Sequence, residues 1–246
     1  GTDGKVVVEY GAYKYISHFS EGLAAVVSMK DEVGYIDDRG NEVVPCKYSL
    51  VDDRYRRTER GNFLFIVPAF HDGYAVVRGA GGELLFVSRF GTELRTPYKP
   101  VSHFNDGFAV VRVGTGFDYI DKQGELLLGS QVDLAEPFSH GLAYIEREGE
   151  KAFIDAEGKT VLRIPRNWKY ISGFSGETNK LACFSNDDEE DFFINANGKK
   201  KFDSFYCAGG FHSGYAEVLL DKASRTRGAL SSTGEILYEC APMQLL

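Results

Sequence analysis

The sequence predicts an all-β protein built from tandem β-hairpin repeats. Three observations lead to this prediction. A Phe followed by a Gly three residues later and an Ala five residues later recurs along the chain. About twenty residues after each such Phe, an Asp, Asn or Ser stands three places before a Gly. No stretch shows the 3.6-residue apolar period of an amphipathic helix, so we expect strands throughout.

The first half of each repeat predicts a tight turn followed by a strand. The residue two positions after the Ala is apolar in every copy, which puts both side chains on one face of a strand. A recurring Ala indicates a layer too closely packed for a larger side chain. The fifth copy is degenerate, because four residues are inserted at its turn. The repeats begin near Phe19, Phe70, Phe104, Phe138, Phe174 and Phe211.

The second half of each repeat predicts a β-hairpin. A short polar residue at the first position and Gly at the fourth are typical of a type I turn, in which the polar side chain accepts a hydrogen bond from the backbone two residues on. Gly tolerates the left-handed conformation that returns the chain to a strand. Apolar residues flank each turn on both sides. The turns run from Asp37 to Gly40, Ser88 to Gly91, Asp121 to Gly124, Asp155 to Gly158, Asn195 to Gly198 and Ser231 to Gly234.

The spacing of these glycines predicts how the units are organised. Successive turn glycines lie 51, 33, 34, 40 and 36 residues apart. A period of this length with strand patterns is typical of stacked or radially arranged β units. Each unit is too small to bury its own apolar face, so its neighbours must cover it. We therefore expect about six units of roughly 34–40 residues in a single β-repeat domain over residues 1–246.

The arrangement of the units has two possible forms. A propeller blade usually has four strands in about 40–45 residues, and most of these units are shorter. The segment Gly4 to Val8 resembles the strand that follows each later turn glycine, which gives seven trailing segments against six leading ones. A ring closed by strand exchange would have equal numbers. We therefore expect an open stack or superhelix, with a six-bladed β-propeller-like ring as the alternative.

These residues resemble the bacterial WG-repeat family, whose units read roughly F-x-E-G-L-A-x-V, then W-G-Y-I-D-x-x-G, then a valine-rich strand. The best match runs from Phe19 to Tyr48, and all six units follow the pattern. The Trp-Gly pair itself is nowhere intact: Val33 and Gly34 stand in its place in the first unit. The resemblance implies a divergent member of a family of bacterial β-repeat proteins, often exported and with no shared reaction.

Composition limits the classes of partner. The chain carries 28 basic and 36 acidic residues, a net charge of −8, which argues against binding to a nucleic-acid backbone. No run approaches the roughly 20 apolar residues of a transmembrane helix. The four cysteines show no C-x-x-C spacing and are interpreted as free thiols rather than zinc ligands. We find no motif for a cofactor, and expect none.

One insertion is the best local candidate for a binding site. The first unit is longer than the others by about fifteen residues, and the surplus falls between Tyr48 and Phe70. Long loops in compact domains are often functional. Arginine is suited to a bidentate grip on carboxylate or phosphate. The sequence therefore offers, as partner-binding residues, Arg54, Arg56, Arg57 and Arg60, with a mobile surface loop as the alternative.

Three other features are interpreted as structural. All histidines lie within two residues of a repeat Phe, but at different offsets, so we expect outward-facing turn residues rather than metal ligands. The acidic run from Asp187 to Asp191 lacks the spacing of a calcium loop and is expected at a solvated hairpin tip. Aromatic residues after the turn glycines are expected in the core. The histidines are His18, His71, His103, His140 and His212, and the aromatics are Tyr13, Tyr15, Tyr48, Trp168 and Tyr170.

These observations favour a non-enzymatic role. Repeats place equivalent residues in equivalent positions, whereas an active site needs one asymmetric cluster. We expect a binding or scaffold protein that presents an extended surface to a protein or glycan partner, in an extracytoplasmic compartment of a bacterium, as the resemblance implies. The alternatives are a carbohydrate-active enzyme of propeller-like architecture and a structural module of a larger protein.

Overall fold

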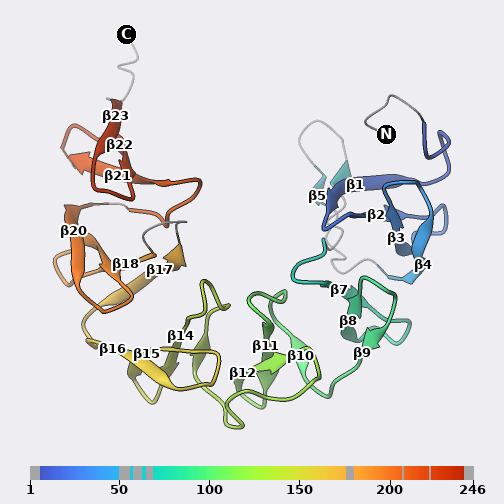
Figure 1. Cartoon of the computed structure of the whole chain (residues 1–246), viewed down its shortest axis with the longest axis horizontal. Helices are drawn as coiled ribbons and strands as arrows, with labels where there is room; N and C mark the ends of the chain where they lie inside the picture. The colour runs from blue at the N-terminus through green and yellow to red at the C-terminus, as the bar shows by residue number, and fades with distance from the viewer. Residues whose placement is uncertain are drawn as a thin grey trace. The chain divides into compact units, whose positions relative to one another are not determined.

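The computed structural model describes residues 6–49, 69–175, 180–206, 208–221 and 223–240, together with the backbone of two short strands at 56–57 and 63–64. The chain divides into two compact parts, each made of several repeats. We call them unit 1 (Gly1–Gln131) and unit 2 (Val132–Leu246). Each unit contains three antiparallel sheets in which the strands follow chain order. Figure 1 shows these sheets along the chain. The described part of the chain contains no helix, and so none that is long and apolar enough to cross a membrane.

Unit 1 holds sheets 1 to 3. Their strands are, for sheet 1, β1 (Tyr15–Ser20), β2 (Leu23–Val27), β3 (Val33–Asp37) and β4 (Glu42–Tyr48); for sheet 2, β7 (Tyr74–Arg78), β8 (Leu84–Ser88) and β9 (Glu93–Leu94); and for sheet 3, β10 (Lys99–Pro100), β11 (Phe108–Val113) and β12 (Gly116–Asp121). A separate pair joins β5 (Arg56–Arg57) to β6 (Phe63–Leu64).

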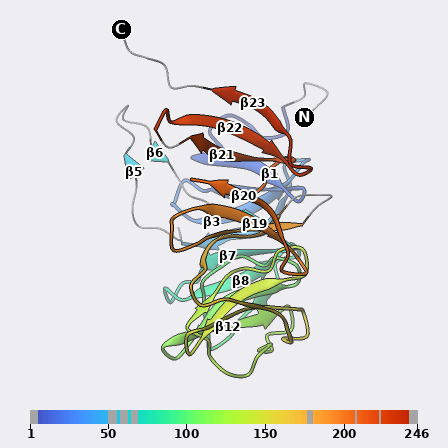
Figure 2. The same ribbon diagram turned by 90° about the vertical axis from the view of Figure 1, so that its left-hand side faces the viewer.

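Unit 2 holds sheets 4 to 6. Their strands are, for sheet 4, β13 (Leu134–Ala135), β14 (Ala143–Arg147), β15 (Glu150–Ile154) and β16 (Thr160–Ile164); for sheet 5, β17 (Lys169–Ser175), β18 (Leu181–Ser185), β19 (Asp191–Asn195) and β20 (Lys200–Phe205); and for sheet 6, β21 (Tyr215–Asp221), β22 (Thr226–Ser231) and β23 (Ile236–Cys240). In Figure 2, sheet 6 lies as a layer above β19 and β20 of sheet 5.

The predicted fold class is confirmed: the protein is an all-β array of tandem hairpin repeats, and none of its sheets closes on itself. Two turns build each repeat. The first follows the Phe, where two adjacent residues both have positive φ, such as Glu21 (52°) and Gly22 (80°). A two-residue loop of this kind is a type I′ turn, whose twist matches that of the strands it joins. The same pair of positive φ values occurs at Asp72, Asp106, His140 and Ser213, each followed by Gly.

The second turn is the predicted type I turn. In the first repeat the amide of Gly40 donates to the carbonyl of Asp37 at 3.1 Å, and Asp37 Oδ1 accepts from the amides of Arg39 and Asn41. The other five repeats form the same backbone bond, at 2.8–3.1 Å. The short polar side chain therefore fixes the turn as the sequence pattern indicated.

The turn glycine has a second role that the sequence did not reveal. A Cβ on Gly234 would lie 2.5 Å from the Phe202 ring, and one on Gly198 would lie 2.7 Å from Leu162. Both neighbours come from the last strand of the preceding sheet. Gly40 has the same relation to Val7, which precedes sheet 1. The glycine therefore permits both the turn and the close packing of the next sheet.

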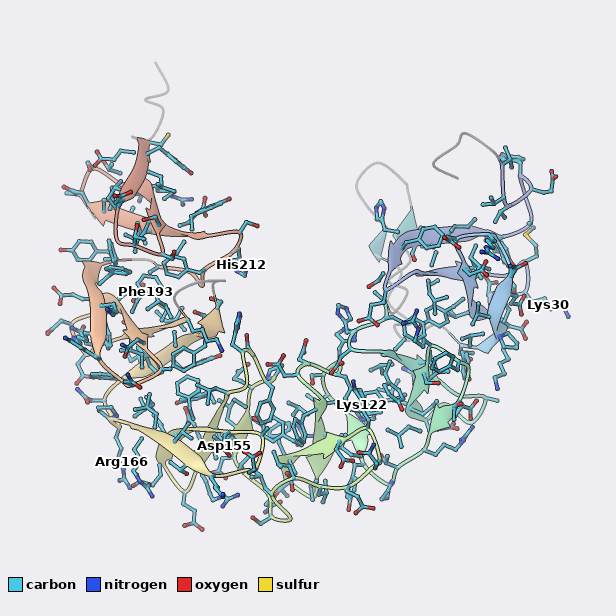
Figure 3. All side chains as sticks on the ribbon, in the orientation of Figure 1. Lys30, Lys122, Asp155, Arg166, Phe193 and His212 are labelled. Atoms are coloured by element: carbon cyan, nitrogen blue, oxygen red, sulfur yellow. The ribbon has the colours of Figure 1, made fainter. Side chains whose placement is uncertain are left out.

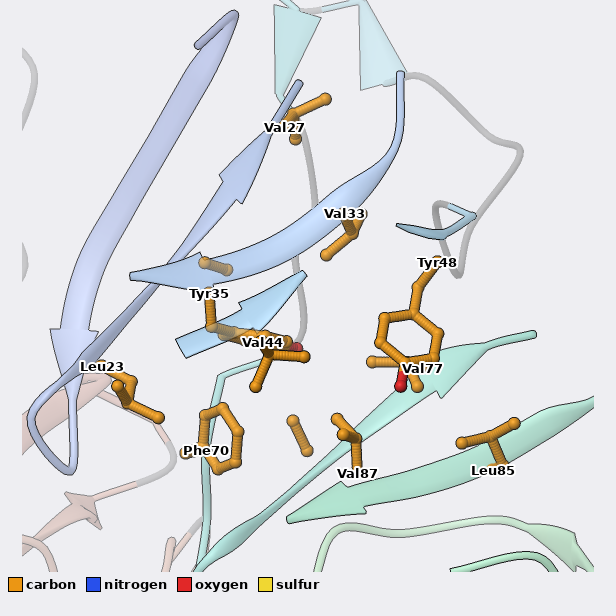
Figure 4. Close-up of a cluster of buried hydrophobic side chains, with 12 residues drawn as sticks. Leu23, Val27, Val33, Tyr35, Val44, Tyr48, Phe70, Val77, Leu85 and Val87 are labelled. Carbon is orange, nitrogen blue, oxygen red and sulfur yellow. The ribbon is translucent and has the colours of Figure 1, made fainter. Parts of the chain in front are cut away.

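The core lies between successive sheets of a unit. Between sheets 1 and 2, Tyr35 meets Phe70 edge to face with ring centroids 4.7 Å apart, and Val44 and Val77 close the layer (Figure 4). The repeat Phe of each later sheet in a unit likewise packs on a ring in the sheet before it, from β8, β15 or β19. These contacts are Phe86 with Phe104 at 4.7 Å, Phe153 with Phe174 at 4.6 Å, and Phe193 with Phe211 at 5.0 Å.

Sheet 3 departs from the pattern in its fourth strand. A single bridge between Ile120 and Leu126 stands where the other repeats continue a strand. The buried carboxylate of Asp118 accepts hydrogen bonds from the amides of Tyr119 at 2.6 Å and Leu128 at 3.0 Å. A side chain thus binds backbone groups that a regular strand would have paired.

Candidate functional site

The predicted arginine site is only partly described. Arg54 and Arg60 lie outside the described residues, as do the side chains of Arg56 and Arg57. The backbone of the last two forms β5, with Arg56 opposite Leu64 and Arg57 opposite Phe63. A partner-binding role for these four arginines stays a prediction.

A second candidate site lies in the segment that precedes the repeat Phe. In sheet 1, Ser17 Oγ accepts from the amide of Ala25 at 2.9 Å and donates to the carbonyl of His18 at 2.8 Å. The pairing of β1 with β2 shifts register at this point, between Ile16 and Phe19. The serine therefore fills the gap left by a bulge, and bulges re-aim nearby side chains.

Sheet 3 repeats this device. Ser102 Oγ accepts from the amide of Val110 at 2.9 Å and donates to the carbonyl of His103 at 2.8 Å. The two serines stand two residues before Phe19 and Phe104. This Ser-x-Phe spacing was present in the sequence and was missed, because it carries no chemistry until the bulge is seen.

The bulged strands expose apolar side chains. Ile16 is 42% exposed and Val101, the residue before Ser102, is 52% exposed. Phe19 is 51% exposed, whereas Phe70 and Phe104 are buried. Isolated exposed apolar residues need no explanation, but these occur at related positions of two repeats.

The leading segments of unit 1 lie side by side. Ser20 Oγ donates to the carbonyl of Phe70 at 2.7 Å, and the amide of Gly73 donates to Glu21 Oε2 at 2.8 Å. These bonds join sheet 1 to sheet 2. We call this surface the leading edge; it consists of Ile16, Phe19, His71, Val101 and His103.

The next step along the leading edge joins sheets 2 and 3. The amide of Gly107 donates to Asp72 Oδ2 at 2.6 Å, and Lys122, labelled in Figure 3, pairs with Asp72 Oδ1 at 2.5 Å. Asp72 thus has the same position in its turn as Glu21, and receives the same kind of bond from the following turn.

Two histidines meet on this edge. The rings of His71 and His103 lie with centroids 4.4 Å apart and planes inclined by 39°. Burial and the neighbouring His71 lower the pKa of His103 below its usual value. Both histidines are exposed, as expected of outward-facing turn residues. The contact between their rings was not predicted; it arises because His71 follows its Phe, His103 precedes its Phe, and the two segments are adjacent.

The acidic run was interpreted correctly except at its end. Asn186 Oδ1 accepts from the amides of Asp188 and Glu190 at 2.9 Å, which makes a compact hairpin tip with exposed carboxylates. Asp191 is buried, and its Oδ2 accepts from the amide of Ala208 at 2.6 Å. The hydropathy of the run could not distinguish this structural carboxylate from its solvated neighbours.

The aromatic residues follow the expectation of burial. Tyr48 is buried, and the other four are half-buried against core clusters. In unit 2, Tyr170 stacks on Tyr144 with centroids 4.3 Å apart, and Tyr144 donates to Glu146 Oε1 at 2.7 Å. Burial raises the pKa of nearby Glu136. These carboxylates border a packed aromatic contact between sheets 4 and 5.

The sequence matches the model of one known protein family in three regions. The profile of the family described as WG containing repeat matches residues 1–28, 34–53 and 119–150, which is less than half of the chain. These three regions match the WG-containing repeat. The resemblance inferred from the leading and turn motifs is confirmed, although no intact Trp-Gly pair occurs. No curated sequence matches this chain.

Solved structures resemble the chain only in general fold. The computationally designed Ika8 protein is 14% identical, with a TM-score of 0.49 over 92% of this chain and 74% of that one. BamB from Moraxella catarrhalis is 13% identical, with a TM-score of 0.45 over 92% and 73%. Hsv2 from Kluyveromyces lactis is 10% identical, with a TM-score of 0.42 over 89% and 74%. At these scores the likenesses carry no argument about function.

Proposed function

We propose that this protein is a non-catalytic scaffold that binds a protein or glycan partner along the leading edge of unit 1. The observation that carries the proposal is the exposure of Ile16 and Val101 at equivalent positions, three residues before the repeat Phe, together with the exposure of Phe19. Serine-filled bulges hold two of these strands in place. A preformed surface of this kind binds without a large cost in conformational entropy.

The chemistry of the leading edge suits a partner with both apolar and polar groups. Apolar side chains alternate with the imidazoles of His71 and His103. Aromatic and apolar anchors surrounded by polar groups are typical of recognition surfaces. As part of the proposal, the protein works outside the cytoplasm of a bacterium.

The test is a double substitution, Ile16→Asp with Val101→Asp. Both side chains are exposed, so the fold should tolerate the change, and partner capture should fall at least about tenfold, which corresponds to about 1.4 kcal/mol. The matched control is Val161→Asp, because Val161 on β16 is 48% exposed and lies in unit 2. Capture is measured by crosslinking to extracts of the source compartment, with melting temperature as the check on folding.

Two results would count against the proposal. If the double variant and the Val161→Asp control capture the partner equally well, the leading edge is not the binding surface. Sustained turnover by the unmodified protein in a screen of glycosidase and esterase substrates would contradict the non-catalytic role.

A further inference from the structure

A groove on sheet 6 has the features of a binding site. Its volume is about 580 Å³. It is lined by the half-buried Leu219, by the core residues Ala208 and Val218, and by the charged residues Glu217, Arg225 and Arg227. Gly209, beside Ala208, also lines it. All of these residues belong to unit 2.

The two arginines are available to a ligand. Among the residues that the structure describes, neither Arg225 nor Arg227 makes an ion pair or a side-chain hydrogen bond, and both are exposed. A planar guanidinium with free donors is suited to a carboxylate or phosphate.

A groove in unit 1 provides a contrast. It has a volume of about 400 Å³ and is lined by Glu83 among others. There the carboxylate is already paired, because Glu83 Oε1 accepts from Arg95 at 2.7 Å. The charges at the unit 2 groove have no such partner within the described part of the chain. These exposed charges are therefore open to a ligand of complementary charge.

The third charged residue narrows the class of ligand. Glu217 lies in the same groove as the arginines, so a phosphate dianion or a polyanion would meet a like charge there. A single carboxylate avoids this repulsion, and the net charge of −8 also disfavours polyanions. The half-buried Leu219 accepts an apolar side chain attached to the same molecule.

The backbone beside the groove leaves space for a ligand. The amides of Tyr206 and Gly209 donate to the carbonyls of Leu219 and Glu217, and a single bridge joins Ala208 to Val218 of β21. Gly209 presents no side chain, and a Cβ there would meet nothing within 4 Å. A ligand can therefore approach the backbone closely at Gly209, whereas the amide of Ala208 is already bonded to Asp191.

We propose that the sheet 6 groove binds a peptide segment of a partner protein through a carboxylate held by Arg225 and Arg227, with an adjacent apolar side chain against the half-buried Leu219. This inference rests on the proposed binding function and adds a second, chemically defined contact to it.

The probes are three fluorescently labelled octapeptides. The first alternates Leu and Asn, with one central Asn replaced by Asp, and has an amidated C-terminus, so it carries a single side-chain carboxylate. The second alternates Leu and Asn and has a free C-terminal carboxylate. The third alternates Leu and Asn and is amidated, so it carries no carboxylate. We expect binding, measured by fluorescence anisotropy, to the first or the second and not to the third; which of the two binds identifies a side-chain or a terminal carboxylate.

Two variants locate the binding. Arg225→Asn with Arg227→Gln removes both charges, and Asn tolerates the positive φ of 55° at residue 225. Gly209→Phe fills the groove, since its Cβ has open space around it. Each variant should weaken peptide binding at least about tenfold. The matched control, Arg163→Ala, removes an exposed arginine from β16 and should bind like the unmodified protein.

The outcomes separate this inference from the proposed function. Three results would contradict peptide binding in the sheet 6 groove: equal binding of all three peptides, tighter binding of inorganic phosphate, or unchanged binding by both variants. Loss of partner capture by the Ile16→Asp, Val101→Asp variant would still support the leading edge in each of those cases. Conversely, carboxylate-dependent peptide binding lost in both groove variants stands even if the leading-edge variant captures normally.

Discussion

Sheets 1 and 6 are built from the same turns and strands, yet the faces that point along the stack differ in chemistry. On sheet 1 this face carries Ala25 and Val33, which are buried against sheet 2. On sheet 6 the equivalent residues are Glu217 and Arg227, both exposed. The backbone of a repeat therefore does not decide whether its face becomes an interface; a few side chains do. Polar outer faces favour solubility in repeat arrays, and the described part of sheet 6 carries exposed charges on this face.

The comparison extends to the third and fourth strands. Tyr35 of sheet 1 provides the ring on which Phe70 packs. Ala229 occupies the equivalent position in sheet 6, and its cross-strand partner Tyr238 is 52% exposed. Among the described residues, sheet 6 therefore has no ring at the position where Tyr35 of sheet 1 receives Phe70.

Placing the charged pair of sheet 6 on the equivalent face of sheet 1 should have the largest effect on the free energy of unfolding. Ala25→Glu with Val33→Arg would place two charges in the buried layer between sheets 1 and 2. Desolvating both costs on the order of 5 kcal/mol or more, which approaches the whole stability of a typical domain. Chemical denaturation followed by circular dichroism should show loss of the first transition or of the folded state.

The reverse exchange is the control. Glu217→Ala with Arg227→Val should leave the unfolding free energy within about 1 kcal/mol, because both positions are exposed. It should also promote concentration-dependent association, seen by light scattering, since it creates an apolar patch. Equal destabilisation by both exchanges would show that the two faces are equivalent after all.

Truncating the repeat Phe should give the next largest difference. Phe104→Ala removes a buried ring that contacts Phe86 and Tyr74, at an expected cost of about 3–5 kcal/mol. Phe19→Ala removes a half-exposed ring and should cost less than about 1 kcal/mol. Denaturant midpoints of the two variants would measure the contrast, and similar values would mean that Phe19 is buried in solution.

These contrasts show what the sequence could and could not predict. The turns at Asp37 and Asp121 follow from local chemistry, so their positions were predictable residue by residue. The burial of Phe104 and the exposure of Phe19 were not, because burial depends on a neighbouring sheet. Likewise the His71–His103 contact and the sheet 6 groove come from segments that approach only after the sheets have stacked.

An ion cluster between sheets 1 and 2 should make unit 1 sensitive to acid. Glu93 Oε1 accepts from Lys47 at 2.9 Å and from Tyr48 at 2.8 Å, and Oε2 binds Arg95 at 2.7 Å. The bonds from Lys47 and Tyr48 lower the pKa of Glu93 to about 2. Since the folded pKa lies below the unfolded one, the stabilisation is present above about pH 4.5 and is lost as the pH falls towards 2.

Charged hydrogen bonds of this kind contribute about 1.5–3 kcal/mol. Glu93→Gln should therefore lower stability at pH 7 and flatten its dependence on pH between about 4.5 and 2. Urea titrations at a series of pH values test this; an unchanged slope in the variant would show that other carboxylates dominate.

The smallest expected effect concerns the histidine pair that joins sheets 2 and 3. Burial and His71 lower the pKa of His103, so the folded state favours the neutral imidazole. Its contribution is present above the unfolded pKa of about 6.5 and is lost as the pH falls below that value. Asp72 and Lys122 pair nearby with each other, so the two charges largely offset.

The test compares two variants. In His103→Gln, the change in unfolding free energy between pH 7.5 and 5 should be smaller than in the unmodified protein by about 1 kcal/mol or less. His18→Gln alters an exposed ring on β1 and should leave this change in free energy as it is. Equal pH profiles for the two variants would show that the ring contact has no energetic consequence.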